Sequence, residues 1–198
     1  MKVKNLFVLV VVLLATASFA RADIIGWSCQ DDGDGAIDCV AAFNGAEPYV
    51  MSIEGDQYWG PGHMEGSFTT DTAVDPTVTM NTAIDNDTSF AWAGYQVNVY
   101  MDSTFTLSDA AVASPTDWTA AITQPTLVGG EYVGSILYQG GTPIDVNGTL
   151  EFGYKMSFSG SMGYNFCQEM TPVAVPEPTT LVLLSLAGLM GLAYRRRG

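Results

Sequence analysis

The chain has 198 residues and a formal net charge of −14, with 21 Asp and Glu against seven Lys and Arg. Six of the seven basic residues lie near the two ends of the sequence, so residues 23–174 contain 20 acidic residues and a single base, Lys155. This segment lacks the basic surface that contacts to phosphate require, and we expect no nucleic-acid partner. At roughly 150 residues, it is long enough for one domain with a substantial core.

The first 22 residues have the composition of a secretory signal peptide. Lys2 and Lys4 precede the apolar run Leu6–Leu14, and Ala20 and Ala22 are the small residues that a signal peptidase recognises. We therefore expect a signal helix over this segment, cleavage after Ala22 by signal peptidase, and export of the domain that begins at Asp23. An uncleaved N-terminal anchor is the alternative.

Residues 23–174 show the period-two alternation of half-buried antiparallel strands. The clearest examples are residues 95–101 and 150–158, and turn residues recur about every eight to twelve positions. The pattern predicts an all-β domain, an antiparallel two-sheet β-sandwich of jelly-roll or Ig-like type, with a closed barrel as the alternative. Prolines bracket the strand at Trp118, which favours an edge strand or a short strand. Weaker strands are expected at Tyr49–Ile53, Met64–Phe68, Thr77–Met80, Thr104–Leu107, Trp118–Thr123 and Tyr132–Tyr138.

The densest polar stretch has the sequence CQDDGDGAIDC. Its Asp32, Asp34 and Asp38 fall at the third, fifth and ninth positions of a loop that partly resembles the calcium loop of EF-hands and dockerins. Gln30 and Ala41 replace the first and last ligands of such a loop, and no helices flank it. A weak calcium site at the three aspartates is therefore one of two interpretations.

The other interpretation is a Gly-Asp hairpin turn closed by a disulfide between Cys29 and Cys39. Export exposes cysteines to an oxidising compartment, and the spacing of these two suits a bridge across a hairpin. Cys167 is then left over. Three alternatives are open for Cys167: a bridge to Cys29 or Cys39 in place of the one between them, a bridge to another chain, or burial as a small apolar residue.

Nothing in the sequence forms a catalytic motif, and we expect no enzyme. A single histidine, His63, excludes multi-histidine metal sites, and no G-x-S-x-G elbow accompanies it. With 20 acidic residues, a pair of carboxylates at catalytic separation carries no information. One alternative is a carbohydrate-binding module that displays Trp27, Trp59, Trp92 and Trp118. A less favoured one is an extracellular hydrolase built on His63 or a carboxylate pair.

Two tripeptides, Asn86-Asp87-Thr88 and Asn147-Gly148-Thr149, match the acceptor pattern for N-glycosylation. Asn, Asp and Gly are also ordinary turn residues, and we favour that interpretation for both tripeptides.

Residues 175–198 combine three features in a fixed order. A Pro-Glu-Pro motif stops helical structure, because each proline lacks a backbone donor. An uncharged run of about sixteen residues comes next, just short of the roughly 17–25 of a membrane-spanning helix. Three arginines then hold its end in the cytoplasm. The motif is Pro176, Glu177 and Pro178, the run is Thr179–Tyr194, and the cytoplasmic anchor is Arg195, Arg196 and Arg197.

This order resembles the PEP-CTERM sorting signal of exported bacterial proteins, which an exosortase-type membrane enzyme recognises. The resemblance implies that a C-terminal transmembrane helix holds the chain in the membrane before it is processed and sorted to the cell surface or extracellular space. A permanent membrane anchor is the alternative.

Residues 23–174 are also similar to the exported part of other PEP-CTERM proteins, through the residues around Trp92, Trp118 and Tyr154. That resemblance favours a β-sandwich and implies a structural or interaction role in an exopolysaccharide-rich layer. The expected partners are the exosortase, signal peptidase and extracellular polysaccharide, and no cofactor is expected apart from calcium.

Overall fold

The computed structural model of the chain describes residues 23–71, 76–158 and 162–176. The predicted signal helix, the predicted transmembrane helix and the three arginines lie outside these residues. Within them, no helix of sufficient length and apolarity to cross a membrane occurs. The strands are β1 (Ile24–Asp31), β2 (Ile37–Phe43), β3 (Tyr49–Gln57), β4 (Gly62–Thr70), β5 (Thr77–Asn86), β6 (Trp92–Met101), β7 (Phe105–Ser114), β8 (Thr119–Val128), β9 (Glu131–Ile144), β10 (Thr149–Phe158) and β11 (Gly163–Ala174).

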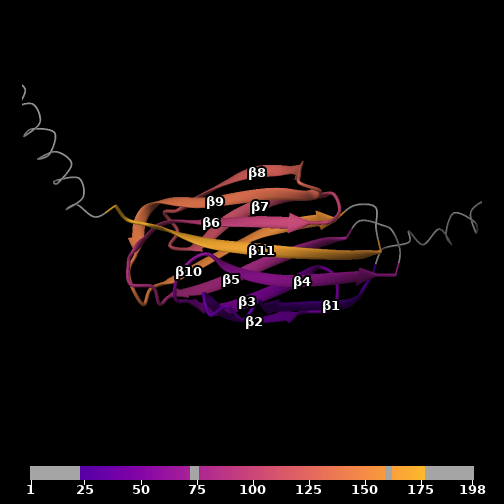
Figure 1. The fold of residues 1–198 in the computed structure, drawn as a ribbon, viewed down its shortest axis with the longest axis horizontal. Helices are drawn as coiled ribbons and strands as arrows, with labels where there is room; N and C mark the ends of the chain where they lie inside the picture. Colours follow the sequence, from indigo (N-terminus) through magenta and orange to yellow (C-terminus); the bar gives the residue numbers. More distant parts are fainter. Residues whose placement is uncertain (1–22, 72–75, 159–161, 177–198) are drawn as a thin grey trace, which may run out of the picture.

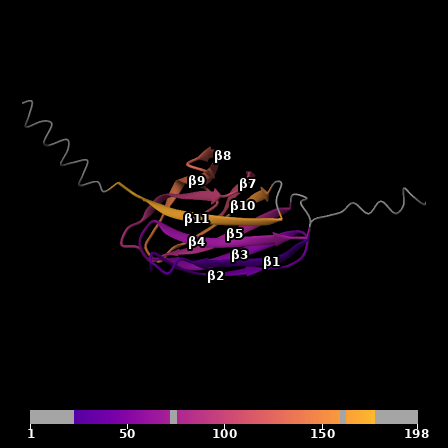
Figure 2. The same ribbon diagram turned by 45° about the vertical axis from the view of Figure 1, so that its right-hand side comes forward.

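The strands form two sheets that lie one over the other (Figures 1 and 2). The six-stranded sheet has the order β1-β4-β11-β6-β9-β8, and the five-stranded sheet has the order β2-β3-β5-β10-β7. The all-β prediction is confirmed, and the closed barrel is wrong because each sheet ends in two free edges. Pairing is antiparallel except between β3 and β5, which run parallel because β4, between them in the chain, belongs to the other sheet. The jelly-roll or Ig-like subtype stays a prediction.

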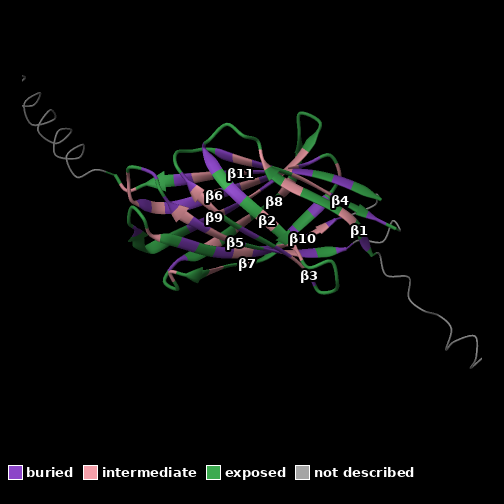
Figure 3. Cartoon of the chain, turned by 90° about the horizontal axis from the view of Figure 1, so that it is seen from below, coloured by how far each residue is buried: buried purple, intermediate pink, exposed green. Residues whose placement is uncertain are grey.

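Buried and exposed residues alternate along the strands (Figure 3). The buried apolar residues form the core between the sheets. The apolar residues of β6 and β10 that were expected to share one face are all buried. Aromatic rings from opposite sheets meet there: the centroids of Phe68 and Phe158 are 5.3 Å apart, and those of Tyr138 and Phe152 are 4.7 Å apart. Burial of this apolar surface is the main term that holds the two sheets together.

The aspartate-rich segment between β1 and β2, residues 32–36, is not the predicted hairpin. It crosses from one sheet to the other, because β1 lies in the six-stranded sheet and β2 in the five-stranded sheet. We call this connection the arch. The predicted disulfide is not formed: Cys29, Cys39 and Cys167 are free thiols. The prediction of an edge strand after Trp118 is confirmed, since β8 borders its sheet and its register shifts around Pro125.

The chain leaves the sandwich at the end opposite to the start of β1 (Figure 1). β11, an inner strand of its sheet, ends at Ala174 beside Trp92, and the Val175 N–H donates to the Ala91 carbonyl. Asp31, the last residue of β1, lies at this same end, because β4 pairs with both β1 and β11 there. The arch therefore lies at the same end of the sandwich as the point where the chain continues toward Pro176.

Candidate functional site

The arch places two carboxylates beside the imidazole of His63 at the start of β4. Nδ1 of His63 lies 3.5 Å from Oδ2 of Asp32. One ligand atom each from Asp32, Asp34 and His63 lie within 4.8 Å of one another. The loop is held by its own aspartates: Oδ1 of Asp32 accepts the Asp34 N–H, and Oδ1 of Asp34 accepts the Ala36 N–H at 2.7 Å. We call the side chains of Asp32, Asp34 and His63 the arch site.

The imidazole of His63 is contacted on its other side by β11. Glu169 is the register partner of His63, and its Oε2 lies 3.3 Å from Nε2. Oε1 of the same carboxylate accepts a hydrogen bond of 2.7 Å from Asn98, whose own Oδ1 accepts one from Gln96. A row of side chains on β6 and β11 therefore fixes the position of Glu169, and Glu169 in turn fixes His63.

Asp38, the third residue of the predicted calcium set, lies elsewhere. It is on β2, in register with Asp56 of β3, which is in register with Asp85 of β5. Burial raises the pKa of Asp56, and the charges of Asp87, Asp85 and Asp38 raise it further. The structure thus brings together Asp32, Asp34 and His63, and it places Asp38 in a row of acids on the outer face of the five-stranded sheet. Calcium binding stays a prediction.

The three thiols are in surroundings that oppose ionisation. Burial raises the pKa of Cys29 to about 12 and, with smaller contributions from nearby acids, that of Cys39 to about 12. Cys167 lies on β11, where burial and then the charges of Glu65 and Glu169 raise its pKa to about 11. The thiolate is the nucleophilic form of cysteine, and reactive cysteines lie in electropositive surroundings that stabilise it. The three cysteines here lack such surroundings.

We expect alkylation of Cys167 by iodoacetamide to be slow at pH 8 and to accelerate until the pH reaches about 11. An ordinary thiol would level off above about pH 8.5. Mass spectrometry of the modified peptide at a series of pH values measures the rate, and the same peptide in urea provides the control. A plateau near pH 9 in the folded protein would contradict the burial of this thiol and the acidic surroundings described above.

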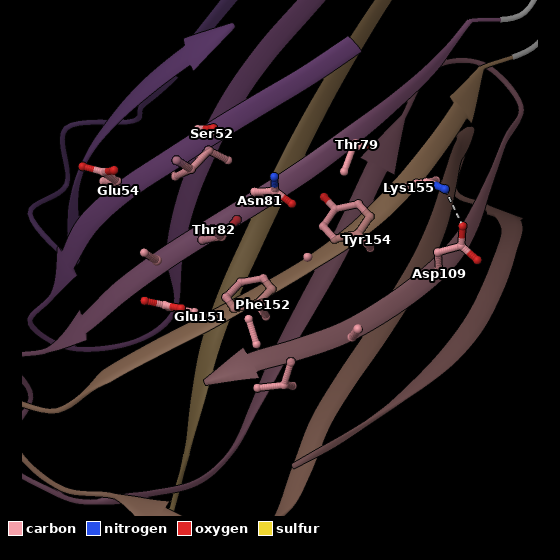
Figure 4. A pocket seen from close by; sticks show the side chains of 16 residues that line it. Ser52, Glu54, Thr79, Asn81, Thr82, Asp109, Glu151, Phe152, Tyr154 and Lys155 are labelled. Carbon is pink, nitrogen blue, oxygen red and sulfur yellow. Dashed lines mark hydrogen bonds and ion pairs between the residues drawn. The ribbon is translucent and has the colours of Figure 1, made fainter. Parts of the chain in front are cut away.

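A groove of about 500 Å³ runs over the outer face of the five-stranded sheet (Figure 4). Ser52, Asn81 and Gly153 form its floor, in register across β3, β5 and β10. A Cβ atom at Gly153 would lie 2.9 Å from Oδ1 of Asn81, so glycine keeps the floor open. Lys155, paired with Asp109 at 2.7 Å, lies toward one end of the groove (Figure 4). Glu54 and Glu151 lie toward the other end.

The tryptophans do not form a stacking platform on either sheet of the described sandwich. Trp92 and Trp118 are buried, and the exposed pair, Trp27 and Trp59, lie on different elements. Trp27 packs against Phe43 at the edge of the sandwich, and Trp59 lies in the turn between β3 and β4. The predicted lectin-like display of aromatic side chains therefore finds no support in this arrangement.

Comparison with known proteins identifies the segment that follows β11. Residues 174–197 match the PEP-CTERM protein-sorting motif, and no curated protein matches the chain significantly. Ala174 ends β11, and Pro176 is the last residue of the motif that the structure describes. Glu177, Pro178 and the three arginines lie outside the described residues. The motif implies export and cell-surface sorting through an exosortase. The chain therefore carries a PEP-CTERM sorting motif at residues 174–197, as its Pro-Glu-Pro, apolar and Arg-rich order predicted.

Proposed function

We propose that this chain is a non-catalytic, exported protein whose acidic β-sandwich has a structural or interaction role in an exopolysaccharide-rich layer outside the cell. The observation that carries the proposal is the PEP-CTERM motif at residues 174–197. In this scheme, signal peptidase removes residues 1–22, a helix over Thr179–Tyr194 holds the chain in the membrane, and the exosortase then processes the tail.

The surface of the sandwich is consistent with a role outside the cell. Lys155, the one basic residue in the described ranges apart from His63, is paired with Asp109. The remaining charge is acidic, which favours solubility and attracts cations from the medium. The contacts of His63 are with the carboxylates of Asp32 and Glu169, an arrangement that does not support a Ser-His-Asp triad.

Localisation tests the proposal directly. In cells with an active exosortase, we expect the chain in the extracellular polysaccharide fraction, at a mass that lacks the apolar tail. In cells without the exosortase, we expect it in the membrane fraction with the tail attached. Recovery of the full tail from cells with the active enzyme would overturn the processing step and favour a permanent anchor.

Carbohydrate binding is the second candidate, and the groove on the five-stranded sheet is the feature that favours it. Its hydrogen-bonding groups come from Ser52, Asn81 and Glu54 and would contact sugar hydroxyls directly. A glycan array with the wild-type chain and Asn81→Ala tests this. We expect weaker binding by Asn81→Ala and unchanged binding by Asn165→Ala, an exposed asparagine on the other sheet. A blank array would remove this candidate and leave the localisation result unaffected.

A further inference from the structure

We propose that the arch site, formed by Asp32, Asp34 and His63, binds a divalent transition-metal ion of the zinc type, and that Glu169 positions the histidine for it. This inference does not depend on the proposed function. The three side chains provide one imidazole nitrogen and two carboxylate groups. Zinc binds histidine nitrogen and carboxylate oxygen, and many zinc sites have three protein ligands with a fourth position left for water or an outside group.

The spacing of the ligand atoms fits such an ion. Zinc lies about 2.0–2.1 Å from histidine nitrogen and about 2.0–2.2 Å from carboxylate oxygen, so tetrahedral ligands are about 3.3–3.5 Å apart. Nδ1 of His63 and Oδ2 of Asp32 are 3.5 Å apart, and an Asp34 oxygen completes a group that spans at most 4.8 Å. The site would close when the Asp34 carboxylate approaches the other two ligand atoms to the zinc spacing.

The hydrogen bonding of His63 supplies a second, separate indication. Glu169, on β11, lies at hydrogen-bond distance from Nε2 and accepts only, so Nε2 must carry the hydrogen. In the neutral tautomer, the lone pair of Nδ1 then faces the carboxylate of Asp32, which is also an acceptor. A metal ion between Nδ1 and this carboxylate would be bound by both of these acceptors.

The support around Glu169 has the arrangement found behind metal-bound histidines. Metal-bound histidines commonly donate their second N–H to a carboxylate, which fixes the tautomer and the orientation of the ring. Here Glu169 accepts from His63 and is held by Asn98, which is held by Gln96. Glu169 and Asn98 belong to β11 and β6, away from the arch, so this support is built by the sheet and not by the aspartate loop.

The donor set also separates zinc from calcium. Calcium prefers six to eight oxygen ligands, and the site presents a nitrogen in place of one of them. Asp38, which would have added an oxygen, lies on the other sheet among Asp56 and Asp85. We therefore expect the arch site to bind zinc, which accepts an imidazole ligand, more tightly than it binds calcium.

Isothermal titration calorimetry of the full chain in mild detergent, with zinc as the only added metal, tests the proposal. We expect saturable binding of one zinc ion and a characteristic visible spectrum with cobalt in its place. His63→Gln is expected to lower the affinity at least about 100-fold, and Glu169→Gln about 10–100-fold, the range for lost support of a ligand. Asp38→Asn changes an exposed aspartate outside the arch site, so it is the matched control and should bind like the wild type.

Two further controls define the outcome. Cys167→Ser separates the arch site from a thiol site, since thiolate ligands give cobalt an intense ultraviolet band and the arch site does not contain one. Thermal unfolding shows that each variant is folded before it is titrated. Absence of saturable zinc binding, or equal binding by His63→Gln, would overturn the proposal. So would tighter binding of calcium that survives His63→Gln, which would assign the aspartates to a calcium loop.

Discussion

Replacing Pro176, Glu177 and Pro178 together by alanine is expected to leave the chain in the membrane with its apolar tail attached. These residues form the Pro-Glu-Pro motif of the matched sorting segment. They directly follow Val175, whose N–H donates to the Ala91 carbonyl of the sandwich. Alanine restores the backbone donors that proline lacks, so the triple variant removes the stop to helical structure that the motif supplies. Fractionation and mass measurement give the result.

The matched control changes the other end of the same segment. Replacing Arg195, Arg196 and Arg197 by lysine preserves the positive charge that fixes membrane orientation. We expect this variant to be oriented and processed like the wild type. Neither change touches the sandwich core, so both variants should unfold at the wild-type temperature. Normal processing of the triple alanine variant would show that recognition resides outside the Pro-Glu-Pro motif.

The sequence was most informative where one strand could be judged by itself. β6 and β10 alternate without interruption, and their boundaries and buried faces were predicted closely. β1 and β11 were missed for identifiable reasons. A register shift between Ile24 and Gly26 breaks the period of two in β1. In β11, one of the buried positions is polar: Gln168, whose Oε1 accepts a hydrogen bond from Tyr154.

The candidate site shows the same division between local and long-range information. Asp32 and Asp34 were identified from spacing within one short segment. Their partner His63 lies at the start of β4, and Glu169 lies 106 residues beyond His63. Only the registers of β1 with β4 and of β4 with β11 bring these groups together, and register cannot be deduced from a single strand. The structure places Asp38 on β2, apart from Asp32 and Asp34, because the arch sends the following strand into the other sheet.

Asn86, at the end of β5, is a polar residue with several hydrogen bonds at the chain-exit end of the sandwich. It is fully buried. Its Nδ2 donates to the carbonyls of Phe90, Ile144 and Asp145 at 3.0–3.2 Å. Its Oδ1 accepts from the N–H and the hydroxyl of Thr88, and Trp92 donates to that hydroxyl. The tripeptide at residues 86–88 is therefore a structural turn, as favoured from the sequence, and a buried asparagine with all its groups engaged is not a glycosylation acceptor.

Asn86→Asp is expected to lower the free energy of unfolding by at least about 3 kcal/mol at neutral pH. The change is nearly isosteric, but it turns the donor group into an acceptor that faces three carbonyl oxygens in a buried site. A loss of this size is a large part of the roughly 5–15 kcal/mol that stabilises a typical domain. Urea unfolding followed by tryptophan fluorescence measures it, since Trp92 is buried beside the turn.

Asn81→Asp is the matched control, because Asn81 lies on the same strand with its side chain exposed, and we expect a change within about 0.5 kcal/mol. The pH dependence gives a second criterion. Burial and the facing carbonyls raise the pKa of the introduced carboxyl group above its unfolded value, so the folded state binds the proton more tightly. The deficit of Asn86→Asp should therefore shrink as the pH falls through that raised pKa, and it should be largest above it. A deficit below about 1 kcal/mol, or one independent of pH, would mean that the turn tolerates an anion and that its hydrogen bonds do not stabilise this end of the sandwich.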